Sequence, residues 1–285
     1  MQSYEQCLEI LRNDYGPCYK IGNFMLCPEK KLIRVGHMFG TATKDCFGYF
    51  PEPSLKYDEE TIVIFAGNVF LRSQFPNIDW MTVRLLSCAE GYSEFTDGKN
   101  LYRFWRGEVT MIDEYDESTY SPPSDDRPPG RLFPNEYGFG DEINDDDYVE
   151  PPIPENFKDR VAMGCGYYVS YYVLEDKFYY MDMPILEEFD IPNLRTIVSK
   201  SGFETDYVTD GEKVLYCGER GGYCSTERDG IEYVVVKGLL INGIDLDSIR
   251  VLGEDILADK NALYHGTSVV PFDKLGGFKF IIREM

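Results

Sequence analysis

Residues 256–266 read Ile-Leu-Ala-Asp-Lys-Asn-Ala-Leu-Tyr-His-Gly, and this stretch decides the fold that we expect for the chain of 285 residues. Two short apolar runs flank a polar turn that begins at Asp259. The Asp259 carboxylate can accept hydrogen bonds from the backbone of that turn, and Asn261 tolerates the left-handed conformation that short hairpin turns need. Leu263 and Tyr264 start the return strand, and the closing glycine permits the next reversal. The stretch therefore predicts a β-hairpin.

This stretch is one of three related copies. Tyr216-Cys217-Gly218, Ile241-Asn242-Gly243 and Tyr264-His265-Gly266 each end in a glycine, and the glycines lie 25 and then 23 residues apart. Each copy follows a short apolar run and a tight turn. In the middle copy, Gly238 takes the place of Asn261 in that turn. A repeat of this length is typical of a supersecondary unit that buries its apolar face by stacking on its neighbours. We therefore expect a stack of β-hairpin units over residues 160–285.

The repeated residues resemble a known family. Asp259-Lys260-Asn261 followed by Leu263-Tyr264, together with the upstream Asn242-Gly243 and Asp247-Ser248-Ile249, is similar to the turn that gives the DKNYY repeat family its name. The Asp210-Gly211-Glu212-Lys213 turn differs from that pattern by an extra residue. The family consists of bacterial repeat proteins, and the resemblance implies no catalytic residue. Its members often occur among the genes of secreted polymorphic toxins, so the resemblance implies an immunity role.

The rest of the chain is also rich in strand-forming residues, with 22 tyrosines and 18 phenylalanines. We expect a β-rich α+β protein in which residues 1–111 form a mixed N-terminal lobe and residues 160–285 form the repeat domain. The expected strands are Tyr19–Cys27, Lys31–Val35 and Thr61–Phe65, and the expected helices are Tyr4–Leu11 and Trp80–Ala89, the latter capped by Asp79.

A turn in the N-terminal half resembles the turn at Asp259. In residues 97–102, Asp-Gly-Lys-Asn-Leu-Tyr, the aspartate again stands five residues before the tyrosine. One interpretation is that the N-terminal half is a diverged relative of the C-terminal half. Short turn matches arise easily, however, so chance is the simpler interpretation.

Residues 112–159 differ in composition from both flanks. They contain fifteen acidic residues against three basic ones, and three Pro-Pro pairs interrupt any regular element. One interpretation is a solvated linker between two lobes. The other is a binding arm, because carboxylates interleaved with aromatic rings suit a basic groove on a protein partner. The residues predicted to contact such a partner are Tyr137, Phe139, Asp141, Glu142, Asp145, Asp146, Asp147 and Tyr148.

The net charge of −22 limits the classes of partner. Such a field repels nucleic acid and anionic lipid and attracts basic proteins. The N-terminal residues show no signal-peptide pattern, and no apolar run has the length of a membrane span. The eight cysteines include no Cys-x-x-Cys pair, so we expect reduced, partly buried thiols in a cytoplasmic protein.

Residues for catalysis are scarce. His37 and His265 are the only histidines, and we expect His265 to be a surface strand residue rather than a base. The sequence predicts no metal site and no cofactor. Paired carboxylates near Asp45, Asp58 or Asp97 remain the only material for hydrolytic chemistry.

Two functions from different classes follow. The first is a cytoplasmic immunity protein without enzymatic activity that binds a cognate protein toxin and blocks a basic active-site cleft. The alternative is a hydrolase or carbohydrate-acting β-protein that uses paired carboxylates. A structural scaffold of repeats is a third possibility, and the oligomeric state is left open.

Overall fold

The structure of the chain is a computed structural model. It describes residues 16–22, 24–35, 55–56, 60–89, 92–105, 108–121, 161–164, 171–181, 183–218 and 224–285. Within these ranges the regular elements are β-strands and short 3-10 turns. The prediction of a β-rich protein is therefore confirmed.

Three sheets contain the strands that the structure describes between residues 16 and 121. The first has the order β1-β2-β3-β4, the second β25-β5-β6 and the third β10-β9-β8-β7. Their strands are β1 (Tyr19–Ile21), β2 (Phe24–Cys27), β3 (Leu32–Val35), β4 (Leu55–Lys56), β5 (Thr61–Phe65), β6 (Asn68–Leu71), β7 (Arg84–Ala89), β8 (Tyr92–Thr96), β9 (Asn100–Trp105), β10 (Glu108–Glu114) and the C-terminal β25 (Lys279–Ile282).

Four sheets contain the remaining strands. Three have four strands, in the orders β11-β12-β13-β14, β15-β16-β17-β20 and β21-β22-β23-β24, and the fourth is the hairpin β18-β19. Their strands are β11 (Val161–Met163), β12 (Tyr171–Leu174), β13 (Lys177–Tyr180), β14 (Met183–Pro184), β15 (Arg195–Val198), β16 (Glu204–Thr209), β17 (Val214–Tyr216), β18 (Cys224–Arg228), β19 (Ile231–Val235), β20 (Leu240–Ile241), β21 (Arg250–Val251), β22 (Ile256–Ala258), β23 (Ala262–His265) and β24 (Ser268–Pro271).

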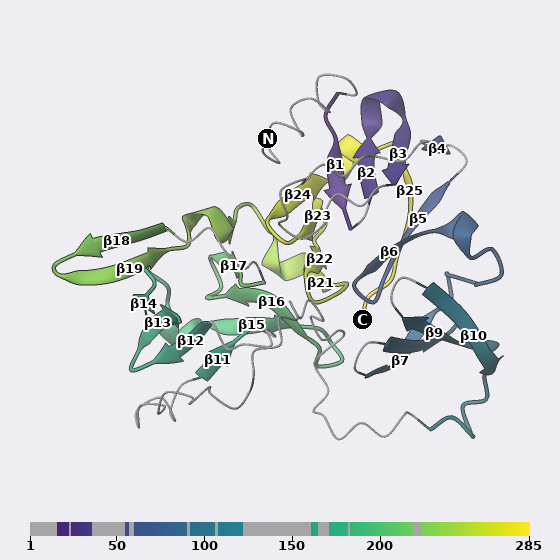
Figure 1. Cartoon of the computed structure of the whole chain (residues 1–285), viewed down its shortest axis with the longest axis horizontal. Helices are drawn as coiled ribbons and strands as arrows, with labels where there is room; N and C mark the ends of the chain where they lie inside the picture. Colours follow the sequence, from purple (N-terminus) through teal and green to yellow (C-terminus); the bar gives the residue numbers. More distant parts are fainter. Residues whose placement is uncertain are drawn as a thin grey trace, which may run out of the picture.

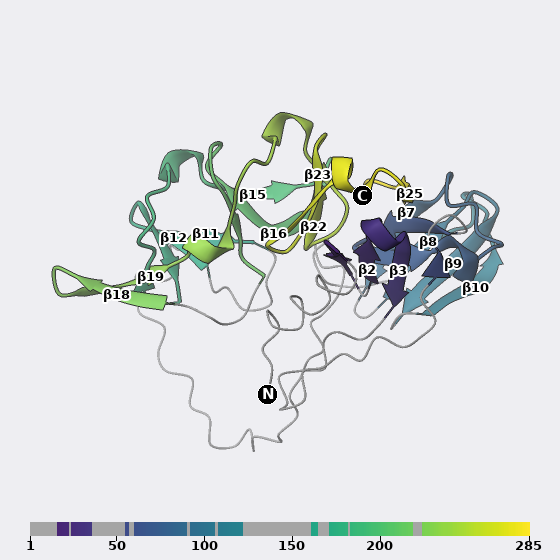
Figure 2. The same cartoon turned by 90° about the horizontal axis from the view of Figure 1, so that it is seen from above.

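The sheets follow one another in a row. Hairpin β18-β19 lies at one end of the row and sheet β7–β10 at the other, and both views agree on this order (Figures 1 and 2). Sheet β21–β24 lies in the middle, between β15–β17 on one side and β25-β5-β6 on the other. The first sheet lies over this middle part, with β1 beside β24.

Among the residues that the structure describes, four hydrophobic cores lie between the sheets of this row. Core 3 joins β12 and β13 to β16, β17 and β19, and core 4 joins β16 and β17 to β22 and β23. Core 1 joins β22, β23 and β24 to β1, β2, β5 and β6, and core 2 joins β5 and β6 to β8 and β9. In core 2, Trp80 stacks on both Phe70 and Phe95, and each such aromatic pair contributes about 1 kcal/mol beyond its buried area.

Core 1 crosses the two sequence ranges that were expected to form separate lobes. Ile62 and Ile64 from the first range pack in this core with Leu252, Ile256 and other residues of the second. Strand β25 pairs in parallel with β5, from Lys279 opposite Thr61 to Ile282 opposite Ile64. A boundary after residue 111 would also cut β10, which runs to Glu114. Residues 1–111 and 160–285 therefore share a core.

The strand predictions are largely confirmed and one helix prediction is wrong. The expected strand Tyr19–Cys27 is the hairpin β1-β2, and the expected strands Lys31–Val35 and Thr61–Phe65 are β3 and β5. Residues Trp80–Ala89 were expected to be helical, but they form a turn followed by β7. Asp79 accepts from the Met81 N–H at 3.1 Å within that turn, so it caps a turn rather than a helix. The predicted helix Tyr4–Leu11 lies outside the described residues.

The three glycine motifs do not occupy equivalent positions. Tyr216 ends β17 and Tyr264 lies in β23, each the third strand of its sheet in chain order, whereas Ile241 ends β20, the fourth strand of its sheet. The spacing of 25 and 23 residues is therefore not the length of a structural unit. Of the three glycines, Gly243 and Gly266 have positive φ, of 78° and 56°, which glycine adopts without strain, whereas Gly218 does not.

Candidate functional site

The structure does not place the residues that the sequence analysis predicted to contact a partner. Asp45 and Asp58, two of the three aspartates considered for hydrolytic chemistry, also lie outside the described residues. The predicted contact residues that lie outside them are Tyr137, Phe139, Asp141, Glu142, Asp145, Asp146, Asp147 and Tyr148.

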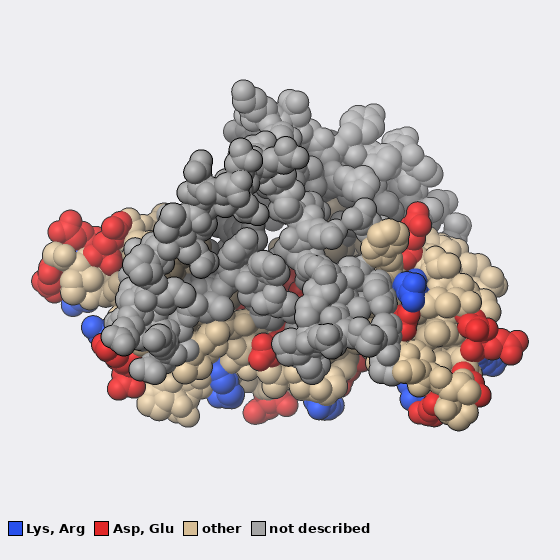
Figure 3. All heavy atoms as spheres, turned by 60° about the horizontal axis from the view of Figure 1, so that its bottom comes forward, with Lys and Arg blue, Asp and Glu red and all other residues tan. Residues whose placement is uncertain are grey.

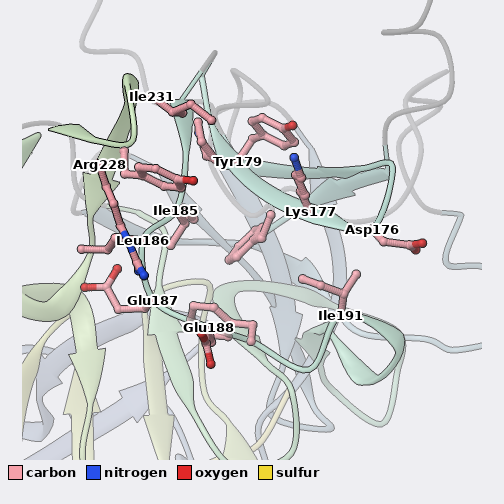
Figure 4. A pocket seen from close by; sticks show the side chains of 14 residues that line it. Asp176, Lys177, Tyr179, Ile185, Leu186, Glu187, Glu188, Ile191, Arg228 and Ile231 are labelled. Atoms are coloured by element: carbon pink, nitrogen blue, oxygen red, sulfur yellow. The ribbon is translucent and has the colours of Figure 1, made fainter. Parts of the chain in front are cut away.

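A groove of about 500 Å³ lies at the end of the row that is formed by hairpin β18-β19 (Figure 4). Strand β13, the segment from Pro184 to Ile191 and hairpin β18-β19 form its walls. We call it the end groove, and its lining residues are Asp176, Lys177, Phe178, Tyr179, Pro184, Ile185, Leu186, Glu187, Glu188, Phe189, Ile191, Arg228, Ile231 and Tyr233.

The floor of the end groove is apolar because it is the outer side of core 3. Phe178 and Ile185 belong to that core, and Phe189 and Ile191 pack against it while keeping part of their surface exposed. Phe178 and Phe189 contact each other edge to face, with ring centroids 5.3 Å apart. At the mouth of the groove Ile231 is 47% exposed. The floor thus offers apolar area to a side chain from another molecule.

Charged side chains surround this floor. Glu187 is held in place because its Oε2 atom accepts from the Val236 N–H at 3.0 Å, and Arg228 extends from the hairpin toward it (Figure 4). The Lys213 ammonium donates to the Glu188 carbonyl and lies 5.3 Å from the centroid of the Phe189 ring. The lining residues include three with carboxylate side chains and two with cationic side chains. A partner that docks here would therefore meet an apolar floor with a mixed, slightly acidic rim.

Hairpin β18-β19 forms an arm that projects from the row (Figure 1). The arm reverses at Asp229 and Gly230, whose φ values of 55° and 77° are those of a type I′ turn. All five residues of β18 are exposed. The base of the arm is fixed, because Val234 bridges to Ile185 and its carbonyl accepts from the Leu186 N–H at 2.9 Å.

Acidic side chains gather at both ends of the row, including the arm (Figure 3). The arm carries Glu227, Asp229 and Glu232 against the single cation Arg228. These carboxylates are exposed, so they remain solvated and available to a basic partner. The hydrophobic floor and the acidic arm therefore lie next to each other at one end of the molecule.

Asp97, Asp210 and Asp259 begin three turns of the same design, which we call the aspartate turns. At Asp259, Oδ1 accepts from the N–H groups of Asn261 and Ala262 at 2.6 and 2.7 Å. Its Oδ2 atom accepts from the Tyr264 hydroxyl and the Asp245 N–H at 2.9 and 2.8 Å. This carboxylate thus holds its own hairpin and also the segment before β21.

The other two aspartate turns repeat this pattern. Asp97 accepts from the N–H groups two and three residues later, from the Tyr102 hydroxyl and from the Asp79 N–H. Asp210 likewise accepts from the N–H groups two and three residues later and from the Asp190 N–H. The spacing between the aspartate and the N–H groups that it accepts from is thus the same in all three turns. The prediction of an extra residue in the turn at Asp210 was therefore wrong. That turn differs in a leucine, Leu215, where the other two turns have a tyrosine.

Two aspartate turns contain a left-handed residue, because Gly98 and Gly211, directly after Asp97 and Asp210, have φ of 91° and 100°. The two residues that the sequence predicted to be left-handed, Asn261 and Gly238, are not, since neither is among the residues of positive φ in the described ranges. The expectation that Asp259 bonds its own turn is confirmed.

Each aspartate turn lowers the pKa of its carboxyl. Burial of the Asp97 carboxyl alone would raise its pKa, but the hydrogen bonds from Asn100, Lys99, Tyr102 and Asp79 stabilise the charged form and bring the pKa below its ordinary value. The pKa values of Asp210 and Asp259 are lowered by the same balance. Both oxygens of Asp97 accept hydrogen bonds, from its own turn, from Tyr102 and from Asp79, so this carboxylate holds the turn in place.

His265 lies in β23 as expected, but it is only partly exposed. Its Nε2 atom is 3.0 Å from Oδ2 of Asp255. Tyr207 donates from its hydroxyl to the backbone carbonyls of Asp255 and Gly266 on either side. The surroundings of His265 therefore fasten β22-β23 to β16, which is a structural role.

The described residues offer no group of three or more His, Cys, Asp or Glu side chains arranged to hold a metal ion. Within the same ranges no helix has the length and hydrophobicity needed to cross a membrane. Comparison with known proteins found no matching family model, no matching curated protein and no matching solved structure. The resemblance to the DKNYY repeat family therefore rests on the motif residues alone.

The end groove and the arm were not predicted from the sequence. One available signal was Asp229-Gly230 between two strand-forming runs, because Asp-Gly is among the strongest short-range signals of a type I′ hairpin. The groove itself had no such signal, since its lining comes from three segments that only the tertiary fold brings together.

Proposed function

We propose that the chain is an immunity protein without enzymatic activity that binds a cognate protein toxin and blocks it by contact. The observation that carries the proposal is the end groove, whose apolar floor is open to solvent beside a projecting acidic arm. An apolar anchor surrounded by charged groups is the usual composition of a protein-binding surface. The resemblance to the DKNYY repeat family supports the same role.

The partner in this proposal is basic. A net charge of −22 accelerates the approach of a positively charged protein and repels nucleic acid and anionic lipid. Docking would place an apolar or aromatic side chain of the toxin on Phe189 and Ile191, with basic residues of the toxin next to Glu227 and Glu232 of the arm. We place this encounter in the cytoplasm, as the sequence analysis expected.

We also propose that the row of sheets consists of related units, each organised by one aspartate turn. The shared hydrogen bonds of Asp97, Asp210 and Asp259 support this proposal. Asp210 and Asp259 lie 49 residues apart in the sequence, which would make the unit about twice as long as the glycine spacing. On this proposal the N-terminal half is a diverged relative of the C-terminal half, and the chain is a β-rich repeat protein.

The alternative of a hydrolase finds no supporting observation among the described residues. Asp97 accepts four hydrogen bonds within its own turn and from Asp79, which leaves it no oxygen for chemistry. The scaffold alternative differs from the immunity proposal because a scaffold would bind no toxin.

The first experiment tests the mode of binding. The toxin domain encoded beside the gene is mixed with the purified chain, and the association rate is measured at low and high ionic strength. We expect the rate to fall by a factor of about ten or more as salt screens the charges. A rate that is equal at both ionic strengths would rule out electrostatic steering, and an absence of binding would rule out the toxin as partner.

The second experiment tests the surface. Ile231→Thr removes apolar area at the mouth of the end groove, and we expect it to weaken toxin binding about tenfold. Val269→Thr is the matched control, because Val269 is an exposed β-branched strand residue in the middle of the row, with 40% exposure against 47% for Ile231. Equal affinities for the two variants would contradict the assignment of the groove.

A third variant tests the segment predicted from the sequence. Tyr137, Phe139 and Tyr148 are replaced together by serine in the full chain, and toxin binding is compared with that of Ile231→Thr. A loss in the serine variant alone would assign the contact to residues 112–159 and not to the end groove.

A further inference from the structure

Two cysteines face each other at the open end of the first hairpin. Cys18 immediately precedes β1 and Cys27 ends β2, and the register pairs Tyr19 with Leu26 and Ile21 with Phe24. The Sγ atoms of Cys18 and Cys27 lie 3.0 Å apart. Neither cysteine has a role in the end groove or in the aspartate turns.

The register of the hairpin suits a bond between these two sulfurs. The chain reverses between Ile21 and Phe24, so these two residues form the closing pair of the ladder. Hydrogen-bonded and non-hydrogen-bonded pairs alternate along an antiparallel ladder, which makes the Cys18–Cys27 position, three pairs away, a non-hydrogen-bonded one. The Cα atoms of such a pair are about 4.5 Å apart, within the range that a disulfide spans.

Both cysteines are buried, but Cys18 keeps a small exposed area. Cys27 is 0% exposed, whereas Cys18 is 8% exposed and its thiol donates to the Gly16 carbonyl at 3.4 Å. Ile21, Phe24 and Leu26 of the same hairpin are buried in core 1. The packing of the hairpin therefore keeps the two sulfurs together in the reduced protein.

We propose that Cys18 and Cys27 form a redox-responsive disulfide by exchange with a small-molecule disulfide. The thiolate of Cys18, the less deeply buried of the two residues, attacks the oxidant, forms a mixed disulfide and releases one small thiol. The Cys27 thiolate then attacks the Cys18 sulfur and releases the second small thiol. The two cysteines lose two electrons and two protons, and the oxidant is reduced to two thiols. The pair remains a dithiol in a reducing compartment.

The bond would fasten the edge of core 1. It closes a loop of ten residues, from Cys18 to Cys27, and so reduces the conformational freedom of the unfolded chain. Because β1 and β2 contribute Ile21, Phe24 and Leu26 to core 1, this restriction stabilises the sheet that lies over the middle of the row. We expect the oxidised protein to melt about 5 °C higher than the reduced protein.

Peptide mapping of the native full chain tests the proposal directly. The protein is equilibrated with oxidised glutathione, alkylated, and digested with trypsin without reduction. Cleavage after Arg12, Lys20 and Lys30 puts the two cysteines in separate peptides, 13–20 and 21–30. We expect these peptides to appear as one linked species that reduction separates. Recovery of both peptides alkylated, or linked to other cysteines, would overturn the proposal.

The melting temperature provides an independent measurement. Wild type is expected to gain about 5 °C on oxidation, and Cys18→Ser is expected to gain nothing. Cys224→Ser is the control, because Cys224 is an exposed cysteine on the arm, and it should keep the full gain. If Cys18→Ser does not fold, the mapping of the wild-type chain decides the question alone. An equal gain in Cys18→Ser and wild type would contradict the assignment.

Discussion

At the scale of single residues, the aspartates that begin the three aspartate turns each hold a turn in place through several hydrogen bonds. Asp259 is 0% exposed and accepts hydrogen bonds from its own turn, from Tyr264 and from the segment before β21. A buried carboxylate is stable only when such bonds replace its water. The sequence predicted the bonds within the turn, because aspartate commonly caps turns. It did not predict the Asp245 bond, which depends on where a separate segment packs.

Asp259→Asn should destabilise the protein by about 3 kcal/mol. An asparagine has one side-chain oxygen, and its amide nitrogen cannot accept a hydrogen bond. If that oxygen keeps the bonds within the turn, the Tyr264 hydroxyl and the Asp245 N–H become buried donors without an acceptor. Chemical denaturation measures the change in the free energy of unfolding. Asp247→Asn, at an exposed aspartate in the 3-10 turn before β21, should change it by less than about 0.5 kcal/mol. Equal effects of the two variants would contradict the role given to Asp259.

The effect of Asp259→Asn should depend on pH. The pKa of Asp259 is lowered in the folded protein, so its stabilisation is fully present above the unfolded pKa of about 4 and is lost as the pH falls through the folded pKa. We therefore expect the difference between wild type and variant to be largest above pH 5 and smaller at pH 3. Using the difference cancels the repulsion among the other carboxylates, which has the opposite sign. A difference that is constant from pH 7 to pH 3 would contradict this expectation.

At the scale of elements, a strand could be predicted where its own residues determine it. It could not be predicted as well where packing against distant residues determines it. The run Thr61–Phe65 is uniformly apolar after its first residue and forms β5 with the predicted bounds. The segment Trp80–Ala89 has apolar residues at spacings that fit a helix, yet it forms a turn and β7 because Trp80 stacks between Phe70 and Phe95. The end groove was not predictable, since it belongs to three segments and to no single motif.

Contacts between turns of neighbouring sheets are another property that no local pattern indicates. Gly253 in the β21-β22 connection lies against Gly67 in the β5-β6 turn, and a Cβ atom on Gly253 would lie 2.2 Å from the Gly67 Cα atom. The Gly67 N–H also donates to the Leu252 carbonyl at 2.7 Å. These two glycines bring sheet β21–β24 and sheet β25-β5-β6 into direct backbone contact.

Gly253→Ala should therefore cost about 2 kcal/mol, because the added methyl group pushes the two turns apart. Gly238→Ala is the matched control. Gly238 is exposed and has no positive φ, and a methyl group added there would meet no atom within 4 Å, so this variant should be close to neutral. Thermal unfolding of both variants measures the difference. A Gly253→Ala variant as stable as Gly238→Ala would show that the two turns separate without cost.

At the scale of the whole molecule, the row of sheets is held together across the middle of the sequence. Core 1 contains residues from both halves, and β25 completes the sheet of β5 and β6. After β25, the Arg283 N–H donates to the Ile64 carbonyl and the Met285 N–H donates to the Val251 carbonyl. The sequence indicated two lobes because the composition changes at residues 112–159, but composition carries no information on which distant strands pair.

Separate fragments should therefore depend on each other. A fragment of residues 160–285 would expose Leu252, Ile256 and Leu263 of core 1, and a fragment of residues 1–121 would lack β25. We expect neither to show a cooperative thermal transition alone, and we expect the mixture to regain one. Calorimetry on each fragment and on the mixture measures this. Cooperative unfolding of either fragment alone would show that the corresponding half is an autonomous domain.

The parallel pairing of β25 with β5 also sets an order of events during synthesis. Residue 61 leaves the ribosome more than 200 residues before residue 279, its partner in the ladder. For most of translation, one side of β5 has no native neighbour, and an uncovered apolar strand of this kind is prone to pair with other chains. The protein is therefore expected to need protection by chaperones until β25 emerges, and its refolding in the test tube should be slow for its size.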